Sequence, residues 1–193
     1  MNLIDSIRKK KVFIKMDLRW GYNNVRIKEE DEWKAVFSIP ECAFEPMVMF
    51  FRLTNSLATF QTIMNDLLRG MIEAGDMAVF IDDVMVGIET EEGHNEIVKE
   101  VLKRIVENDL FIKLEKYIWK VRKVGFLGVV IGLDGVKMEK EKVQGVVDWL
   151  VPRSMKDVQK FLGLANYYRQ FVKDFTRVVK LLYEMMRKDI KWN

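Results

Sequence analysis

Two adjacent aspartates, Asp82 and Asp83, stand within the otherwise apolar run VFIDDVMVG at residues 79–87. An unpaired carboxylate is costly to bury, so this pair must lie at a solvated turn, face a cation or be protonated. A third aspartate, Asp17, ends the run VFIKMD at 12–17. If the two strands are neighbours, the three carboxylates converge at one sheet edge, where Mg²⁺ would offset their repulsion. A plain turn is the alternative, because aspartates commonly satisfy backbone groups at hairpin tips.

The composition is that of a folded domain. The chain has 193 residues, of which 49% are hydrophobic and 32% charged, so it can bury one sizeable core with a small appended lobe. The lone Cys42 excludes an internal disulfide and a cysteine-rich zinc site, and the lone His94 disfavours a serine or cysteine triad. Catalysis would therefore rest on carboxylates, lysines or a metal.

The net charge is only +3, but basic residues gather near residues 8–11, 113–123 and 173–191. Solvated faces explain such runs, and polyanion binding stays open beside that explanation. No apolar run reaches the roughly 18 residues of a membrane span, and residues 1–11 are too polar for a signal peptide. We expect an intracellular protein without membrane contact.

The elements that would position the aspartates follow from periodicity. A strand is predicted over 12–17, and two strands or a hairpin over 25–39, before Pro40. A helix is predicted from Asn55 to Ile72, and its buried face would carry Leu57, Phe60, Ile63, Met64, Leu67, Leu68 and Met71. The run 77–88 predicts a β-hairpin that turns at Asp82 and Asp83.

The second half of the chain begins with a helix predicted over 94–107 and strands over 110–138, with a turn at 133–135. Only helices follow, over 139–150, from a capping box at Ser154 and Asp157, and over 176–188. The order predicts an α+β fold with an antiparallel sheet, helices on one of its faces and a C-terminal helical lobe. We expect two domains, 1–138 and 139–193.

Several blocks resemble the reverse transcriptase domain of gypsy-class LTR retrotransposons, most closely the fungal-type elements. They are KMDLRWGYNNVRIKEEDEWKAVF (15–37), FEPMVMFFRLTNSLATFQTIMNDLL (44–68), VFIDDVM (79–85), FLGVVIGLDGVKMEKEKVQGVVDW (126–149) and KFLGLANYYRQFVKDF (160–175). These blocks run through almost the whole chain in collinear order. The resemblance implies a polymerase palm with partial fingers over 1–138, and the start of a helical thumb over 139–193.

The resemblance also implies roles for the aspartates. Asp17 resembles the first catalytic aspartate of the palm, and Phe80 to Asp83 resemble the family's aromatic-x-Asp-Asp turn. Asp17 and Asp82 would be the main ligands of two Mg²⁺ ions, with Asp83 assisting and Mn²⁺ as a possible substitute.

Further positions match substrate contacts of the family. Tyr22 would close against the sugar of the incoming nucleotide and reject a 2′-hydroxyl, with Phe51 and Arg52 beside that nucleotide. Contacts to primer and template would come from Phe126, Leu127, Gly128, Lys160, Asn166, Tyr167 and Arg169. Plain core packing stays the alternative for Tyr22, Phe51 and Phe126.

The implied chemistry is template-primed nucleotidyl transfer, with deoxynucleotide triphosphates and a primer on an RNA or DNA template. The parent polyprotein would continue into ribonuclease H and integrase, in a cytoplasmic particle or the nucleus. Similar domains begin upstream of Met1, and Asn193 falls where a tether to ribonuclease H would begin. We therefore expect part of the nucleotide site to lie outside this sequence.

This sequence departs from the family's pattern at several positions. Glycine is usual at Cys42 and Arg52, cysteine at Tyr117, and proline at Leu57, Leu114, Leu133, Leu150 and Leu181. Most of these exchanges need one C-to-T or G-to-A change, which suggests a copy decaying by cytosine deamination, although Cys42 needs a transversion. The alternative function is therefore a non-catalytic nucleic-acid-binding remnant, whereas no feature favours a purely structural protein.

Overall fold

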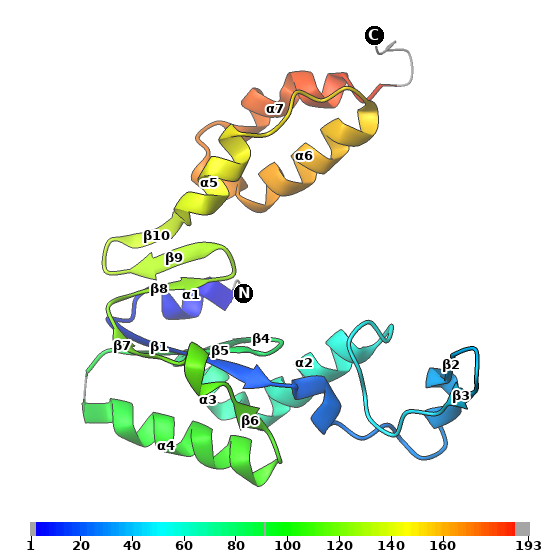
Figure 1. The fold of residues 1–193 in the computed structure, drawn as a ribbon. Coiled ribbons are helices and arrows are strands. Elements are labelled where there is room, and N and C mark those ends of the chain that lie inside the picture. The colour runs from blue at the N-terminus through cyan, green and yellow to red at the C-terminus, as the bar shows by residue number, and fades with distance from the viewer. Residues whose placement is uncertain (1–2, 91, 188–193) are drawn as a thin grey trace. The chain divides into compact units, whose positions relative to one another are not determined.

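The computed structural model describes residues 3–90 and 92–187 and has the expected α+β architecture (Figure 1). It divides into two compact units. Unit 1 comprises Met1–Val124 with Gly132–Gly135, and unit 2 comprises Gly125–Ile131 with Val136–Asn193. Each unit is described by itself.

Unit 1 is built on an antiparallel sheet with β1 (Val12–Arg19) at its centre. The strand order is β4 (Met77–Phe80), β5 (Asp83–Ile88), β1 and β6 (Phe111–Ile112), and β7 (Ile118–Val121) also pairs with β1. The predicted hairpin over 77–88 is confirmed, but Ile81 and Asp82 connect the strands and Asp83 already belongs to β5.

The main core lies between this sheet and helices α2 (Ser56–Leu67) and α4 (Glu92–Glu107). Alternate residues of β1 point into it because successive side chains of a strand face opposite sides. The core includes Ile14, Met16 and Leu18 from β1, Phe60, Met64 and Leu68 from the α2 region, and Val98, Val101 and Ile105 from α4. Leu57 was expected on the buried face of α2, but it is 49% exposed.

As predicted, the long helices α2 and α4 pack together on one face of the sheet. The short helix α1 (Leu3–Ile7) packs against the other face, where Ile7 is fully buried. A Cβ atom at Gly87 of β5 would lie 2.7 Å from Cγ2 of Ile7, so only glycine admits this close approach.

The expected strands over 25–39 are largely absent from this described segment. It holds the 3₁₀ helix η2 (Glu32–Ala35), and the hairpin forms later, between β2 (Phe37–Ser38) and β3 (Ala43–Phe44). Pro40 lies in the loop of this hairpin, where its missing N–H breaks no ladder bond. The helix expected up to Ile72 is divided at Leu68 into α2 and α3 (Arg69–Glu73).

After η3 (Leu114–Lys116) and β7, the next three strands form a second sheet. Its strands are β8 (Lys123–Phe126), β9 (Val129–Gly132) and β10 (Gly135–Met138), in the order β10, β9, β8. The turn predicted near Asp134 is confirmed, and Gly135 there has φ = +94°.

The helices of unit 2 are α5 (Lys140–Val147), α6 (Met155–Tyr167) and α7 (Phe175–Glu184), with the 3₁₀ helix η4 (Arg169–Phe171) between the last two. The predicted capping box is confirmed, because Ser154 Oγ accepts from the Asp157 backbone N–H at 3.2 Å. Lys188, the expected end of the last helix, lies outside the described residues. No helix within 3–90 and 92–187 is long and apolar enough to cross a membrane.

Candidate active site

The strand register brings Asp17 and Asp83 together. They are direct partners across β1 and β5, so their side chains leave the same face of the sheet, opposite the α2 and α4 core. Asp82 precedes Asp83 in the turn, and its carbonyl oxygen accepts from the Leu18 backbone N–H at 2.9 Å. Three aspartates from two distant segments therefore lie at one end of adjacent strands.

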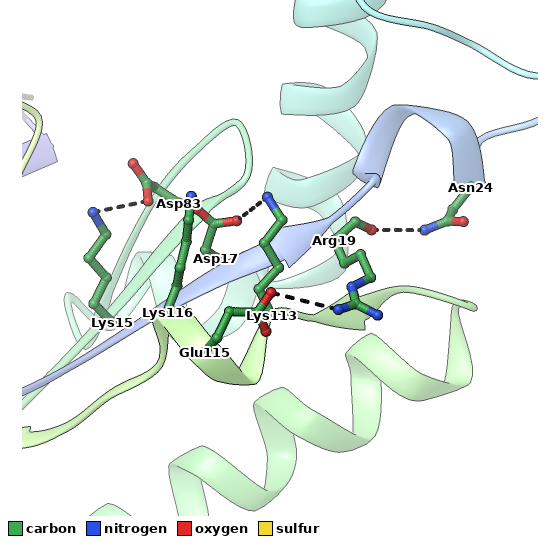
Figure 2. Close-up of polar contacts among 8 residues, drawn as sticks. All are labelled: Lys15, Asp17, Arg19, Asn24, Asp83, Lys113, Glu115 and Lys116. Atoms are coloured by element: carbon green, nitrogen blue, oxygen red, sulfur yellow. Dashed lines mark hydrogen bonds and ion pairs between the residues drawn. The ribbon is translucent and has the colours of Figure 1, made fainter.

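Lysines surround these carboxylates (Figure 2). Lys113 Nζ lies 2.7 Å from Asp17 Oδ1, and Lys116 Nζ lies 3.0 Å from Asp17 Oδ2. Lys15 Nζ lies 3.1 Å from Asp83 Oδ1. Asp17 is 9% exposed, so its charge requires this compensation. The side chains of Lys15, Asp17 and Lys116 also line a surface hollow of about 400 Å³.

The lysines control ionisation at this site. Partial burial of Asp17 would raise the pKa of its carboxyl group, but Lys113 and Lys116 outweigh that effect and hold the pKa below its ordinary value. The bond to Asp17 raises the pKa of Lys116, and the charges of Asp82 and Asp83 add to this rise. The three carboxylates thus act on one shared lysine.

Hard oxygen donors at a strand end are the ligands that Mg²⁺ prefers, so the donor chemistry of the three aspartates suits a divalent cation. The arrangement of their side chains, however, does not form a metal site in this structure. Within residues 3–90 and 92–187, no three acidic, histidine or cysteine side chains are grouped closely enough to hold a metal ion. The lysines occupy the contacts that a cation would make with Asp17 and Asp83.

Aromatic side chains lie beside the carboxylates. Tyr22 belongs to the 3₁₀ helix η1 (Gly21–Asn24), and its ring centroid is 5.1 Å from that of Phe60 and 6.3 Å from that of Phe51. Burial, and then the charge of Asp82, raise the pKa of the Tyr22 hydroxyl. Phe51 is 65% exposed, which excludes core packing for this residue.

Arg52 follows Phe51 with φ = +76°, a left-handed conformation that costs a non-glycine residue roughly 1–2 kcal/mol. Its guanidinium carbon lies 5.8 Å from the centroid of the Phe51 ring. The cation–π contact at such an exposed site is worth about 0.5–1 kcal/mol. The backbone at this position therefore favours glycine.

The residues expected to contact primer and template all belong to unit 2, whereas the three aspartates belong to unit 1. Phe126 is fully buried, so its side chain packs in a core, which was the alternative to a primer contact. Leu127 and Gly128 form the turn between β8 and β9, with φ of +51° and +77°. Tyr167 on α6 donates a hydrogen bond to the Leu127 carbonyl oxygen at 2.7 Å.

The other expected nucleic-acid contacts are exposed on and after α6. Lys160 is exposed, and its Nζ lies 3.5 Å from Asp157 Oδ1. Asn166 and Arg169 are exposed near the end of the helix. Tyr167 is 56% exposed despite its bond to Leu127. These residues are open to solvent and to a ligand.

Sequence reasoning missed the lysines of the acidic site. Lys113 and Lys116 were recognised only as part of a basic run, because their partner Asp17 lies about 100 residues earlier in the chain. Lys15 carries a weak signal, since it is two residues before Asp17 and strand periodicity places both on one face.

Comparison with known proteins places these features in context. Residues 1–131 match the family model described as reverse transcriptase (RNA-dependent DNA polymerase). The Tf2-3 transposon polyprotein of Schizosaccharomyces pombe is 29% identical over 190 residues, which are 98% of this chain and 14% of that protein. The retrovirus-related Pol polyprotein from transposon gypsy of Drosophila melanogaster is 31% identical over 96% of this chain and 18% of its own length.

Solved structures are similar as well. A foamy viral protease-reverse transcriptase in complex with an RNA/DNA hybrid is 26% identical, with a TM-score of 0.85 over 99% of this chain and 26% of that one. A second foamy viral structure, in complex with double-stranded DNA, gives a TM-score of 0.89 at 26% identity and covers 33% of that chain. The present chain thus spans a minor part of each relative's length.

Proposed function

Because the chain belongs to the reverse transcriptase (RNA-dependent DNA polymerase) family, we propose that it extends a primer by nucleotidyl transfer along an RNA or DNA template. The primer 3′-hydroxyl attacks the α-phosphate of a deoxynucleotide triphosphate, a phosphodiester bond forms, and pyrophosphate leaves. The observation that carries this proposal is the register of β1 and β5, which sets Asp17 opposite Asp83.

In this proposal Asp17, Asp82 and Asp83 hold two Mg²⁺ ions, for which Mn²⁺ can substitute. Such ions activate an attacking oxygen and stabilise a leaving one when bound. The lysines now paired with Asp17 and Asp83 must move away for this, since each carboxylate cannot serve both partners at full strength.

The remaining residues position the substrates. The Tyr22 hydroxyl is near enough to Asp82 to be affected by its charge, and the exposed Phe51 lies beside the Tyr22 ring. These two rings would offer aromatic faces for the incoming nucleotide, with Arg52 adjacent. In unit 2, the Leu127–Gly128 turn and the exposed Lys160, Asn166, Tyr167 and Arg169 would follow the primer-template duplex. Backbone-directed contacts of this kind need no base recognition, because the template sets the sequence by pairing.

The proposed setting is a retrotransposon polyprotein. Two of the relatives are named as polyproteins, which supports this setting. Continuity with ribonuclease H and integrase segments, and action in a cytoplasmic particle or the nucleus, belong to the same proposal.

The test is template-primed extension on an RNA template with Mg²⁺, using the chain as it stands and its Asp82→Asn variant. We expect extension by the first and none by the second. Asp109→Asn is a matched control, because Asp109 is exposed and its left-handed φ of +55° is one that asparagine tolerates. Equal extension by the wild type and Asp82→Asn would refute the assignment of the carboxylates.

The second candidate function is duplex binding without catalysis. The left-handed Arg52 beside the site and the lysines that neutralise Asp17 favour it. The five leucines at positions where the resemblance implies proline are all 49% to 84% exposed. None of them fills a buried core position, as expected if these exchanges did not arise to improve packing. Salt-sensitive duplex binding without extension, by both the wild type and Arg52→Gly, would support this remnant over the enzyme.

A further inference from the structure

The turn that carries Asp82 and Asp83 has an unfavourable backbone. Ile81 is the first of the two connecting residues between β4 and β5, and it has φ = +57°. Glycine is preferred where a tight hairpin needs a positive φ, and a β-branched residue there is a genuine outlier. Contacts from the rest of the protein must therefore hold this conformation.

Gln61 on α2 supplies such contacts. Its side-chain Oε1 accepts a hydrogen bond from the Ile81 backbone N–H at 2.7 Å, and its Nε2 donates to the Val79 carbonyl oxygen at 3.1 Å. Nε2 also donates to Asn65 Oδ1 one helical turn later, at 2.9 Å. Both ends of the amide are thus engaged, and the side chain is oriented from its own helix.

The position of β4 explains why an amide is needed. Among residues 3–90 and 92–187 this strand is at the edge of the sheet, so its outer N–H and C=O groups have no neighbouring strand there. The Gln61 amide accepts from residue 81 and donates to residue 79, as a peptide group of an adjacent strand would. It therefore prolongs the pairing of the strand edge into the turn.

The opposite side of the turn is held by β1, because the Leu18 backbone N–H donates to the Asp82 carbonyl oxygen at 2.9 Å. The backbone from Ile81 to Asp83 is thus fixed between α2 and β1. We propose that Gln61 is a positioning residue, whose amide holds the left-handed Ile81 and thereby aims the carboxylates of Asp82 and Asp83. This inference rests on the proposed function for its catalytic meaning.

The first measurement is amide hydrogen exchange in the full chain. Gln61→Met keeps the length of the side chain and removes its bonds to residues 79 and 81, so the Ile81 amide should exchange at least about tenfold faster. Gln61→Glu keeps the acceptor for Ile81 and should leave that exchange slow. Gln144→Met is the matched control, since Gln144 Nε2 also donates to a side chain four residues ahead, Asp148 Oδ1, but belongs to unit 2.

The second measurement is Mn²⁺ affinity, followed by electron paramagnetic resonance without nucleic acid or nucleotide. Loss of an outer partner of metal ligands weakens metal binding by about 10- to 100-fold, and we expect a loss in this range for Gln61→Met. Ile81→Gly in the Gln61→Met background should restore much of that affinity, because glycine adopts the turn conformation unaided. A helix-to-sheet tie without a positioning role would show no such rescue.

Two results would overturn the inference: unchanged Ile81 exchange in Gln61→Met, or faster exchange with unchanged Mn²⁺ affinity. If the backbone amides of Gln61→Met exchange fast throughout β1 and β5, this variant has lost its fold. Ile81→Gly in the Gln61→Met background then tests the inference by the same measurements of amide exchange and Mn²⁺ affinity. If the wild type binds no Mn²⁺, the proposed catalytic function fails first, and the positioning role fails with it. Hydrogen exchange would then still report whether Gln61 holds the turn.

Discussion

Arg52 is a residue whose type conflicts with its backbone conformation. Its φ of +76° suits glycine, whereas both arginine and alanine are strained there. We expect Arg52→Gly to be more stable to urea than Arg52→Ala by about 1 kcal/mol. The comparison isolates the backbone effect, since both variants lose the contact with Phe51. Equal unfolding midpoints would show that this segment relaxes at no cost.

Asp17 should make stability sensitive to acid. Its folded-state pKa is lowered by Lys113 and Lys116 despite partial burial, so the unfolded state binds a proton more readily. The stabilisation is fully present above the unfolded pKa of about 4 and is lost as the pH falls through the lower folded pKa. The free energy of unfolding in urea should be measured from about pH 6 to about pH 2, which covers the titration of the carboxyl group. As the pH falls, it should decrease less in Asp17→Asn than in the wild type. An identical loss in the two proteins would mean that Asp17 is not held by the lysines.

At the scale of elements, the packing of η1 against α2 brings Tyr22 to the carboxylates. Gly21 makes this possible, because a Cβ there would lie 2.5 Å from Cζ of Phe60. Gly21→Ala should destabilise the protein by about 1–3 kcal/mol, as overpacking of a core does.

Gly70→Ala is the control for this substitution. Gly70 is helical within α3 and a Cβ there would meet nothing within 4 Å, so alanine should stabilise by up to about 1 kcal/mol. Both changes are measured as free energies of unfolding by denaturant. A neutral Gly21→Ala would show that the Phe60 ring moves aside freely, and η1 would then not be fixed by this contact.

At the scale of the whole molecule, the two compact units have very different cores. Unit 1 contains the large cluster around β1, whereas the α6–α7 cluster of unit 2 has three buried members, Val158, Leu162 and Val179. Smaller cores bury less apolar surface and open more easily. Amide exchange in α6 and α7 should therefore be faster than in β1 and β5.

Leu162→Ala tests whether the units open independently. Leu162 is 5% exposed, and its truncation should lower the opening free energy of α6 and α7 by about 2–4 kcal/mol while β1 and β5 stay unchanged. Leu181→Ala is the control, because Leu181 is 69% exposed on α7 and should have little effect. Equal losses in both units would indicate a single cooperative molecule.

The sequence by itself determined the local elements of this protein. The apolar run 77–88 predicted a hairpin, the Ser154 and Asp157 spacing predicted a helix start, and collinear blocks identified the family. These features depend on turn chemistry and side-chain periodicity within a few residues, so they need no knowledge of distant partners.

Only the tertiary structure decided what surrounds the carboxylates. Strand register set Asp17 opposite Asp83, and folding brought Lys113 and Lys116 to Asp17 across about 100 residues of chain. The left-handed Ile81 was equally hidden, because no glycine marks it and the bonds that hold it come from Gln61 on another element. Periodicity tells which side chains share a face, but long-range pairing alone determines which charges meet there.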